Sequence, residues 1–192
     1  SFFLQQDPAA AGYRGIRHRR SGARGTPRGV TSFSFCMGMT QLTVAATCHL
    51  LDRRAPWSLT ESWDNTGLLV GDPAAVVTSI LIGLDPTVEL VDSAIELGAN
   101  LVITHHPVVF HPLRSLTPET PGYRVIRRAI RLGIHLVGCH TNWDAAPDGV
   151  GAVLAAALGL REVSPLVPVA DGPNRGLGRI GVPVPGLEAD EL

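Results

Sequence analysis

The chain has 192 residues, a hydrophobic fraction of 45% and a mean hydropathy of +0.19, values typical of a folded protein rather than of a disordered chain. Its formal net charge is -1, and because residues 1–38 hold six Arg and one acidic residue, the remainder is acidic, which argues against a nucleic-acid-binding surface. The apolar runs are far shorter than the roughly 20 residues that a membrane-spanning helix needs, so we expect no membrane among the partners.

The first 38 residues differ from the rest of the chain. Residues 1–38 show no sustained hydrophobic period and are rich in Arg, Gly and Ser. We interpret them as a disordered or wrongly translated leader, with the true start at Met37 or Met39. An Arg-rich, acid-poor leader is also typical of an organellar transit peptide, which stays open as an alternative. The folded domain is then residues 39–192.

Helical and strand patterns alternate through this domain. We predict helices at residues 42–54, 86–97, 123–132 and 150–158, and strands at residues 68–70, 76–84, 100–104, 134–138 and 177–182. Asp85 is expected to cap the second helix, with Pro86 in its first turn. This alternation predicts an α/β fold with a parallel or mixed sheet covered by helices on both faces. The chain stops without a terminating motif, which we interpret as a C-terminal truncation.

Two loops rich in possible metal ligands follow neighbouring predicted strands. One is the sequence Thr-His-His-Pro at residues 104–107, and the other is His-Thr-Asn-Trp-Asp at residues 140–144. Because loops after successive parallel strands gather at one edge of a sheet, we expect the two loops to converge. His105 and His106 could then each reach one ion of a close pair, with Asp144 helping to hold both. Such ligands suit zinc, iron or manganese better than calcium.

Other polar residues near these loops are weaker candidates. His140 could bind metal with the other ligands or could instead orient one of them through a hydrogen bond, and Asn142 near it could line the same pocket. Asp64 and Asn65 belong to a loop that could line a pocket or could be a structured turn anchored by Trp63. We assign no metal role to four further residues: Cys139 as a small buried hydrophobe, His111 as a solvated loop residue, and His49 and His135 as structural histidines.

The cysteines point to a reducing compartment. Cys36, Cys48 and Cys139 are odd in number and widely spaced, so neither a disulfide framework nor a zinc knuckle is indicated. A cytoplasmic location is therefore the expectation.

Three blocks together resemble a known family. These are Trp-Asp-Asn-Thr-Gly-Leu-Leu-Val-Gly-Asp at residues 63–72, the His-His loop at 104–107 and the His-to-Asp loop at 140–144. In their order and spacing they are similar to the NGG-interacting-factor-three-like proteins, also called GTP cyclohydrolase I type 2 homologues. The resemblance covers about residues 40–185 and implies that the chain is the first lobe of a two-lobed α/β fold.

The resemblance also implies a site and an assembly. It suggests two divalent metal ions between the lobes, ring-shaped homohexamers, and metal binding by His105, His106 and Asp144. The family completes its site with a His and a Glu four residues later, near its C-terminus, and neither can be placed in this chain.

Three functions stay open from the sequence. The first is a metal-dependent hydrolase acting on a nucleotide such as GTP. The second is a metal-binding regulatory or scaffold protein that forms a ring without turnover. The third is an inert fragment that lacks its second lobe.

Overall fold

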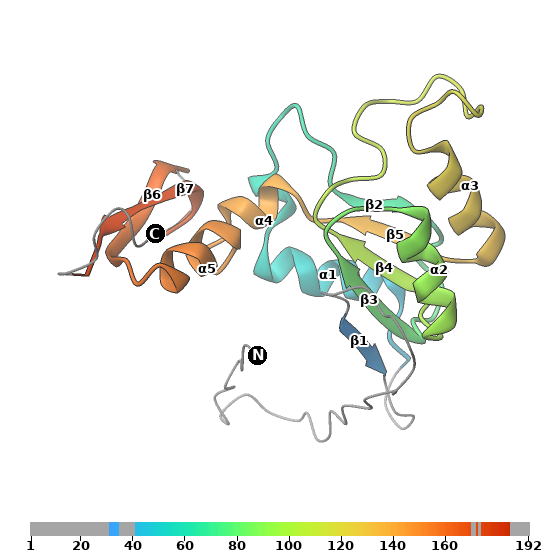
Figure 1. Cartoon of the computed structure of the whole chain (residues 1–192), viewed down its shortest axis with the longest axis horizontal. Coiled ribbons are helices and arrows are strands. Elements are labelled where there is room, and N and C mark those ends of the chain that lie inside the picture. The colour runs from blue at the N-terminus through green and yellow to red at the C-terminus, as the bar shows by residue number, and fades with distance from the viewer. Residues whose placement is uncertain (1–30, 35–40, 170–171, 173, 185–192) are drawn as a thin grey trace.

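The computed structural model describes residues 31–34, 41–169, 172 and 174–184. A five-stranded sheet forms one end of the molecule, and a two-stranded hairpin forms the other (Figure 1). The strands are β1 (Thr31–Ser34), β2 (Gly67–Val70), β3 (Ser79–Gly83), β4 (Leu101–Thr104), β5 (His135–Gly138), β6 (Arg161–Pro168) and β7 (Gly176–Val182). The helices are α1 (Val44–Arg54), the 3-10 turn η1 (Trp57–Leu59), α2 (Val88–Glu96), α3 (Tyr123–Leu132), α4 (Thr141–Ala145) and α5 (Val150–Ala157). Within the described residues, no helix is long and apolar enough to cross a membrane.

The large sheet is mixed. Its strand order is β1-β3-β4-β5-β2, with β3, β4 and β5 parallel to one another and with β1 and β2 antiparallel at the two edges. The register pairs Gly83 with Thr104 and Thr104 with Gly138, so the three parallel strands end level. The predicted α/β fold with a parallel or mixed sheet is therefore confirmed, and the chain segments that follow β3, β4 and β5 leave the sheet at one edge.

Strand β1 falls inside the segment that we interpreted as a disordered or mistranslated leader. Its backbone pairs antiparallel with β3, placing Thr31 opposite Ile82. For these four residues the structure therefore differs from the expected disorder, because they extend the sheet at its β3 edge. The other leader residues, 1–30 and 35–38, lie outside the described residues, as does the end of the chain at 185–192.

Threonine side chains cap the N-termini of α1 and α2. The Oγ1 atom of Thr43 accepts a hydrogen bond from the backbone N of Ala46 at the start of α1. Thr87 does the same for Leu90 at the start of α2, so the predicted cap at Asp85 is wrong. Pro86 precedes the helix instead of lying in its first turn, and a proline disfavours a helical conformation for the residue before it. Asp85 is thereby left for another partner.

The core consists of two buried layers, one on each face of the sheet. Side chains alternate between faces along a strand, so Val102 of β4 lies in one layer, while Leu101 and Ile103 lie in the other. Helices α2 and α3 cover the first layer through side chains such as Val91 and Ala129. Helix α1 and the turn after it cover the second. The strands that lead to the two ligand-rich loops are thus fixed by packing on both faces.

Besides β1 and the short turn η1, the structure contains two further elements that the sequence pattern did not predict. Helix α4 occupies the loop after β5 and has only five residues, too few to show a helical period. Strand β6 contains Pro165 and Pro168, which favour a loop in sequence-based reasoning. The two prolines are tolerated because, among the strands that the structure describes, β6 pairs with β7 alone. Both strands of this antiparallel pair are therefore edge strands.

Candidate metal centre

The two ligand-rich loops meet at the carboxyl edge of the parallel strands. His105 follows β4 directly, and His140 follows β5 after one intervening residue, Cys139. Backbone hydrogen bonds continue the sheet pattern into both loops: Gly83 O accepts from His105 N, and Thr104 O accepts from Cys139 N. The expected convergence of the loops is therefore a direct result of the parallel register.

Three imidazole rings lie together at this edge. Ligand atoms of His105, His106 and His140 all lie within 4.8 Å of one another. The ring centroids are 5.1 Å apart for His105 and His106, 5.0 Å for His105 and His140, and 5.6 Å for His106 and His140. Three nitrogens at such separations could hold a metal ion. The structure thus groups His140 with the two histidines predicted as ligands, whereas the sequence left open whether it binds metal or supports a ligand.

Each of the three rings has its Nδ1 atom held by an oxygen acceptor. The Nδ1 atom of His105 lies 3.0 Å from the carbonyl oxygen of Cys139. For His106 the partner is Asp85 Oδ1 at 2.6 Å, and for His140 it is Asp64 Oδ1 at 2.9 Å. Because carbonyl and carboxylate oxygens only accept, Nδ1 carries the hydrogen in each ring. The lone pair of each neutral ring is then on Nε2, the arrangement found in metal-binding histidines. The donor set therefore fits a divalent cation.

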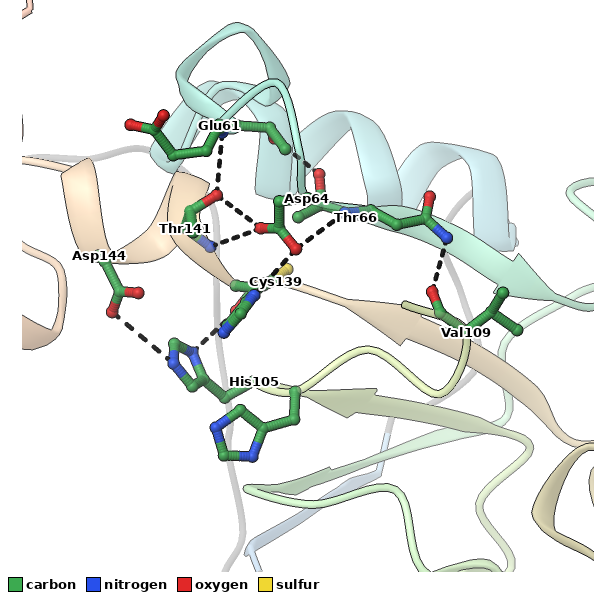
Figure 2. A network of polar contacts seen from close by, with 12 residues as sticks. Glu61, Asp64, Thr66, His105, Val109, Cys139, Thr141 and Asp144 are labelled. Atoms are coloured by element: carbon green, nitrogen blue, oxygen red, sulfur yellow. Dashed lines mark hydrogen bonds and ion pairs between the residues drawn. The ribbon is translucent and has the colours of Figure 1, made fainter. Parts of the chain in front are cut away.

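Asp144 lies beside this group on α4. Its Oδ1 atom is 3.7 Å from Nε2 of His105, and Figure 2 shows the carboxylate pointing toward that ring. It stands outside the set of three ligand atoms that all lie within 4.8 Å of one another. His106 and Asp144 are consequently on the same side of the molecule, both next to His105. Metal binding by His105, His106 and Asp144 stays a prediction that this geometry permits.

Asp64 fixes the position of His140. Its side chain is fully buried and, besides His140, accepts hydrogen bonds from Thr141 N at 3.1 Å, Thr141 Oγ1 at 2.5 Å and Asn65 N at 2.8 Å (Figure 2). Burial would raise the pKa of Asp64, but the hydrogen bonds from His140, Thr141 and the backbone outweigh it, and the pKa is lowered. Asp64 is therefore an ionised buried acceptor.

The two asparagines predicted to line a pocket, Asn65 and Asn142, each donate a hydrogen bond to the backbone of a distant segment. Asn65 Nδ2 donates to the carbonyl of Val109 at 2.6 Å, tying the Trp63 loop to the loop after β4. Asn142 is fully buried and donates to the carbonyl of Ala55 at 2.8 Å, which attaches α4 to the end of α1. Its Oδ1 atom has no hydrogen-bond partner within the described part of the chain. A role for either residue in lining a pocket stays a prediction.

Sequence reasoning missed Asp85 as a partner of the site. It follows β3 at the same edge of the sheet as the histidines, and that position was the available signal. We assigned it to a helix cap because Asp before Pro is a frequent way to begin a helix. The cap is Thr87, and the Asp85 carboxylate holds His106 instead.

The other histidines in the described part of the chain, His49, His111 and His135, are not members of the cluster. His49 is exposed on α1, and His135 is buried in β5, where its Nδ1 atom accepts a hydrogen bond from Asp72 N at 3.2 Å. The ring of His111 contacts Phe110 at a centroid distance of 4.7 Å.

Cys139 contributes its backbone rather than its thiol. Its side chain is buried, and burial, with Cys48 nearby, raises the pKa of the thiol to about 12. A thiol with so high a pKa stays protonated at neutral pH, which agrees with the role of a small buried hydrophobe.

Gly138 sets the spacing between the loops at the end of β5. A Cβ atom at this position would lie 3.2 Å from Leu69 Cδ1 and 3.3 Å from the Cα of Pro107, the residue after His106. Those separations are tighter than ordinary contacts. The absence of a side chain therefore lets the first histidine loop lie directly against the strand that leads to the second.

These features define an α/β protein with a histidine cluster that could bind metal, placed where its parallel strands end. The Duf34/NIF3 (NGG1p interacting factor 3) sequence model matches residues 42–192. The chain belongs to this family, and the resemblance noted from the three sequence blocks is confirmed.

Several relatives support this assignment. The chain is 45% identical over 123 residues to the GTP cyclohydrolase 1 type 2 homolog of Staphylococcus aureus (strain COL), which covers 64% of this chain and 33% of that protein. It is 42% identical over 132 residues to the protein of the same name from Streptomyces coelicolor, covering 68% of this chain and 46% of that one. The crystal structure of a Bacillus cereus protein related to NIF3 superposes with a TM-score of 0.63 at 35% identity, covering 68% of this chain and 36% of that one. The chain thus spans less than half the length of these relatives.

Proposed function

We propose that this chain supplies one wall of a dinuclear metal site in a metal-dependent hydrolase that acts on a nucleotide. The observation that carries the proposal is the set of three imidazoles whose Nδ1 atoms are all bonded to oxygens, which leaves Nε2 of each ring available. The nucleotide is suggested by the name of the Staphylococcus aureus relative, GTP cyclohydrolase 1 type 2 homolog.

The residues of the chain have separate tasks in this proposal. His105, His106 and His140 would hold divalent cations such as zinc, iron or manganese through nitrogen. Asp144, 3.7 Å from His105, would add a carboxylate ligand. Such ions lower the pKa of a bound water and polarise the bond under attack. Asp64 and Asp85 keep the rings of His140 and His106 in their orientations.

Metal binding is tested first, on the chain itself. We expect zinc or manganese to bind to the purified protein, and a His105→Ala, His106→Ala double variant to lose more than about 100-fold in affinity, since losing hydrogen-bond partners of ligands alone costs 10- to 100-fold. Isothermal titration calorimetry and elemental analysis measure this. His49→Ala is the matched control, because His49 is an exposed histidine on α1. Equal metal content in the double variant and the control would refute the proposed site.

Turnover separates an enzyme from the alternative, a metal-binding regulatory or scaffold protein. GTP hydrolysis should be assayed with a longer protein that contains this sequence, because the chain covers only 33% of its Staphylococcus relative. Loss of turnover in Asp144→Ala, with the circular dichroism spectrum unchanged, would support the hydrolase. Metal binding without turnover would support the scaffold.

Two further expectations belong to the same proposal. We expect the longer protein to form a homohexameric ring, which light scattering after gel filtration would measure. We also expect a cytoplasmic location, which cell fractionation would test.

A further inference from the structure

Two large aromatic side chains stand open beside the histidine cluster. Trp63 is 56% exposed and Phe110 is 38% exposed. Their ring centroids are 6.0 Å apart. The ring centroid of His140 lies 6.5 Å from that of Trp63 and 6.2 Å from that of Phe110. Burying an aromatic side chain removes a large apolar area from water, so leaving two of them uncovered at a polar site is unfavourable for folding alone. Such a surface is typical of a ligand-binding site.

The two aromatic residues are held in place although they are exposed. Trp63 directly precedes Asp64, whose carboxylate is buried and accepts hydrogen bonds from His140 and Thr141. Phe110 directly follows Val109, whose carbonyl accepts a hydrogen bond from Asn65 Nδ2 at 2.6 Å. The same short segment therefore anchors both loops, one residue away from each ring. A ligand that binds there would meet a preformed surface, which lowers the entropic cost of binding.

The angles between the rings indicate how a ligand would lie. The planes of Trp63 and Phe110 are inclined by 51°, and the His140 ring meets them nearly edge-on, at 84° and 75°. The three rings thus form a corner rather than a closed stack. One flat ring can lie on the face of Trp63 while Phe110 contacts its edge, and the histidine cluster is then next to it.

A cavity continues from Phe110 along the loop after β4. It has a volume of about 580 Å³, within the range of small-molecule sites, and its lining includes Phe110, His111, Arg114 and Thr120. The Arg114 guanidinium provides a positive charge in this lining. Room of this size beside the aromatic corner suits a ligand that carries further polar groups beyond its flat ring.

We propose that Trp63 and Phe110 form a stacking platform that selects ligands with a planar heteroaromatic ring, of the nucleobase type, for the adjacent histidine cluster. The proposal deepens the proposed function, since it names the groups that recognise the base. It does not depend on turnover, because stacking is an equilibrium property of the two aromatic side chains.

The experiment compares GTP with inorganic tripolyphosphate, which has the phosphates but no ring. Binding is measured by calorimetry on the chain, with and without added zinc, for the wild type, Trp63→Leu and Trp63→Phe. Stacking of one base on an aromatic side chain supports an expected 10- to 100-fold loss of GTP affinity in Trp63→Leu, with most of it recovered in Trp63→Phe. Tripolyphosphate affinity should be unchanged. Phe110→Leu should give a smaller loss that is again specific to GTP.

Matched controls separate this proposal from its alternatives. Leu166→Ala removes an equally open apolar side chain on β6 and should leave GTP affinity unchanged. Equal losses for GTP and tripolyphosphate in Trp63→Leu would mean that Trp63 only supports the fold, and would overturn the platform. Unchanged GTP affinity in Trp63→Leu would overturn it too, and would indicate that these rings instead face another polypeptide.

Failure of the proposed function would look different. Normal stacking behaviour with no metal bound, or with no hydrolysis by the longer protein, would reject the metal-dependent hydrolase and leave the platform standing. Metal binding and GTP hydrolysis that are indifferent to Trp63→Leu would reject the platform alone.

Discussion

The sheet that carries the histidines and the hairpin at the other end of the molecule are held together differently. Every residue of β4 and β5 is buried, whereas no residue of β6 is buried and only Gly176 of β7 is. The hairpin contacts α4 and α5, and Arg179 Nη2 donates to the carbonyl of Ala146 at 2.6 Å. The positions of the histidines are therefore set by packing on both faces of a sheet. The position of the hairpin depends mainly on strand pairing and a few polar contacts.

Apolar side chains show the same contrast. Leu81, Leu101 and Leu136 of the sheet are almost wholly enclosed. On α5 and the hairpin, several large apolar side chains are exposed, namely Val150, Val153, Leu154, Leu166, Val167 and Ile180. The candidate metal centre therefore lies on the part of the chain that contains both buried core layers.

The largest effect is expected from a cavity in the sheet. Leu136→Ala removes a side chain that is 2% exposed and packed in the core, and should lower the free energy of unfolding by about 2–5 kcal/mol. Leu166→Ala makes the same chemical change at an exposed position of the hairpin, where we expect less than about 0.5 kcal/mol. Urea unfolding followed by circular dichroism measures both. Similar losses for the two variants would abolish the distinction between the regions.

A smaller effect is expected where the sheet region supports the metal centre. Asp64→Asn keeps the shape of the side chain but removes the charge that holds His140, so metal affinity should fall about 10- to 100-fold. Calorimetric titration with zinc measures the change. Asp148→Asn alters an exposed carboxylate near α5 and is the control. An unchanged affinity in Asp64→Asn would mean that His140 needs no fixed orientation.

The pH dependence of stability should also trace to Asp64. Its pKa is lowered in the folded protein because of the hydrogen bonds that it accepts, while the unfolded value is about 3.9. The stabilisation from ionised Asp64 is therefore fully present above the unfolded pKa and is lost as the pH falls through the folded one. The difference in urea midpoint between wild type and Asp64→Asn should therefore shrink as the pH falls below about 4. A difference that stays constant at low pH would contradict this assignment.

The smallest effect concerns the ion pair between α1 and the loop before α5. Arg54 Nη1 lies 3.4 Å from Asp148 Oδ2, and both side chains are largely exposed. Solvent screening leaves such a pair with little net value, so Arg54→Ala should change stability by less than about 0.5 kcal/mol. Thermal unfolding of the wild type and of Arg54→Ala at low and high salt would measure this change in stability. A larger, salt-sensitive loss would indicate that the two regions are coupled by charge.

Much of the sheet could be predicted from the sequence. The apolar runs that became β3, β4 and β5 are bounded by Gly or Asn, and parallel order follows from the helices between them. The direction of β2 could not be predicted, because an alternating pattern has no polarity. Strand β6 was missed since Pro165 and Pro168 are compatible with a strand only at an edge, and edges are known only after pairing.

The candidate site was predictable in part for a related reason. Parallel topology alone brings His105 and His106 to the loop that begins with His140. The acceptors on each Nδ1 depend on side-chain conformations, so neither Asp85 nor the Cys139 carbonyl could be foreseen. The contact of Trp63 with Phe110 joins loops that are distant in the chain, and the Asn65 hydrogen bond links the same two loops.

Gly138 has a consequence for how this centre can vary. It bears no functional group, yet a single added methyl would press on both Leu69 and Pro107 and push the first histidine loop away from β5. Replacement by alanine could thus impair cation capture while every donor atom stays in the sequence. Engineering of this centre should treat that bare backbone position with the same care as the imidazoles it brings together.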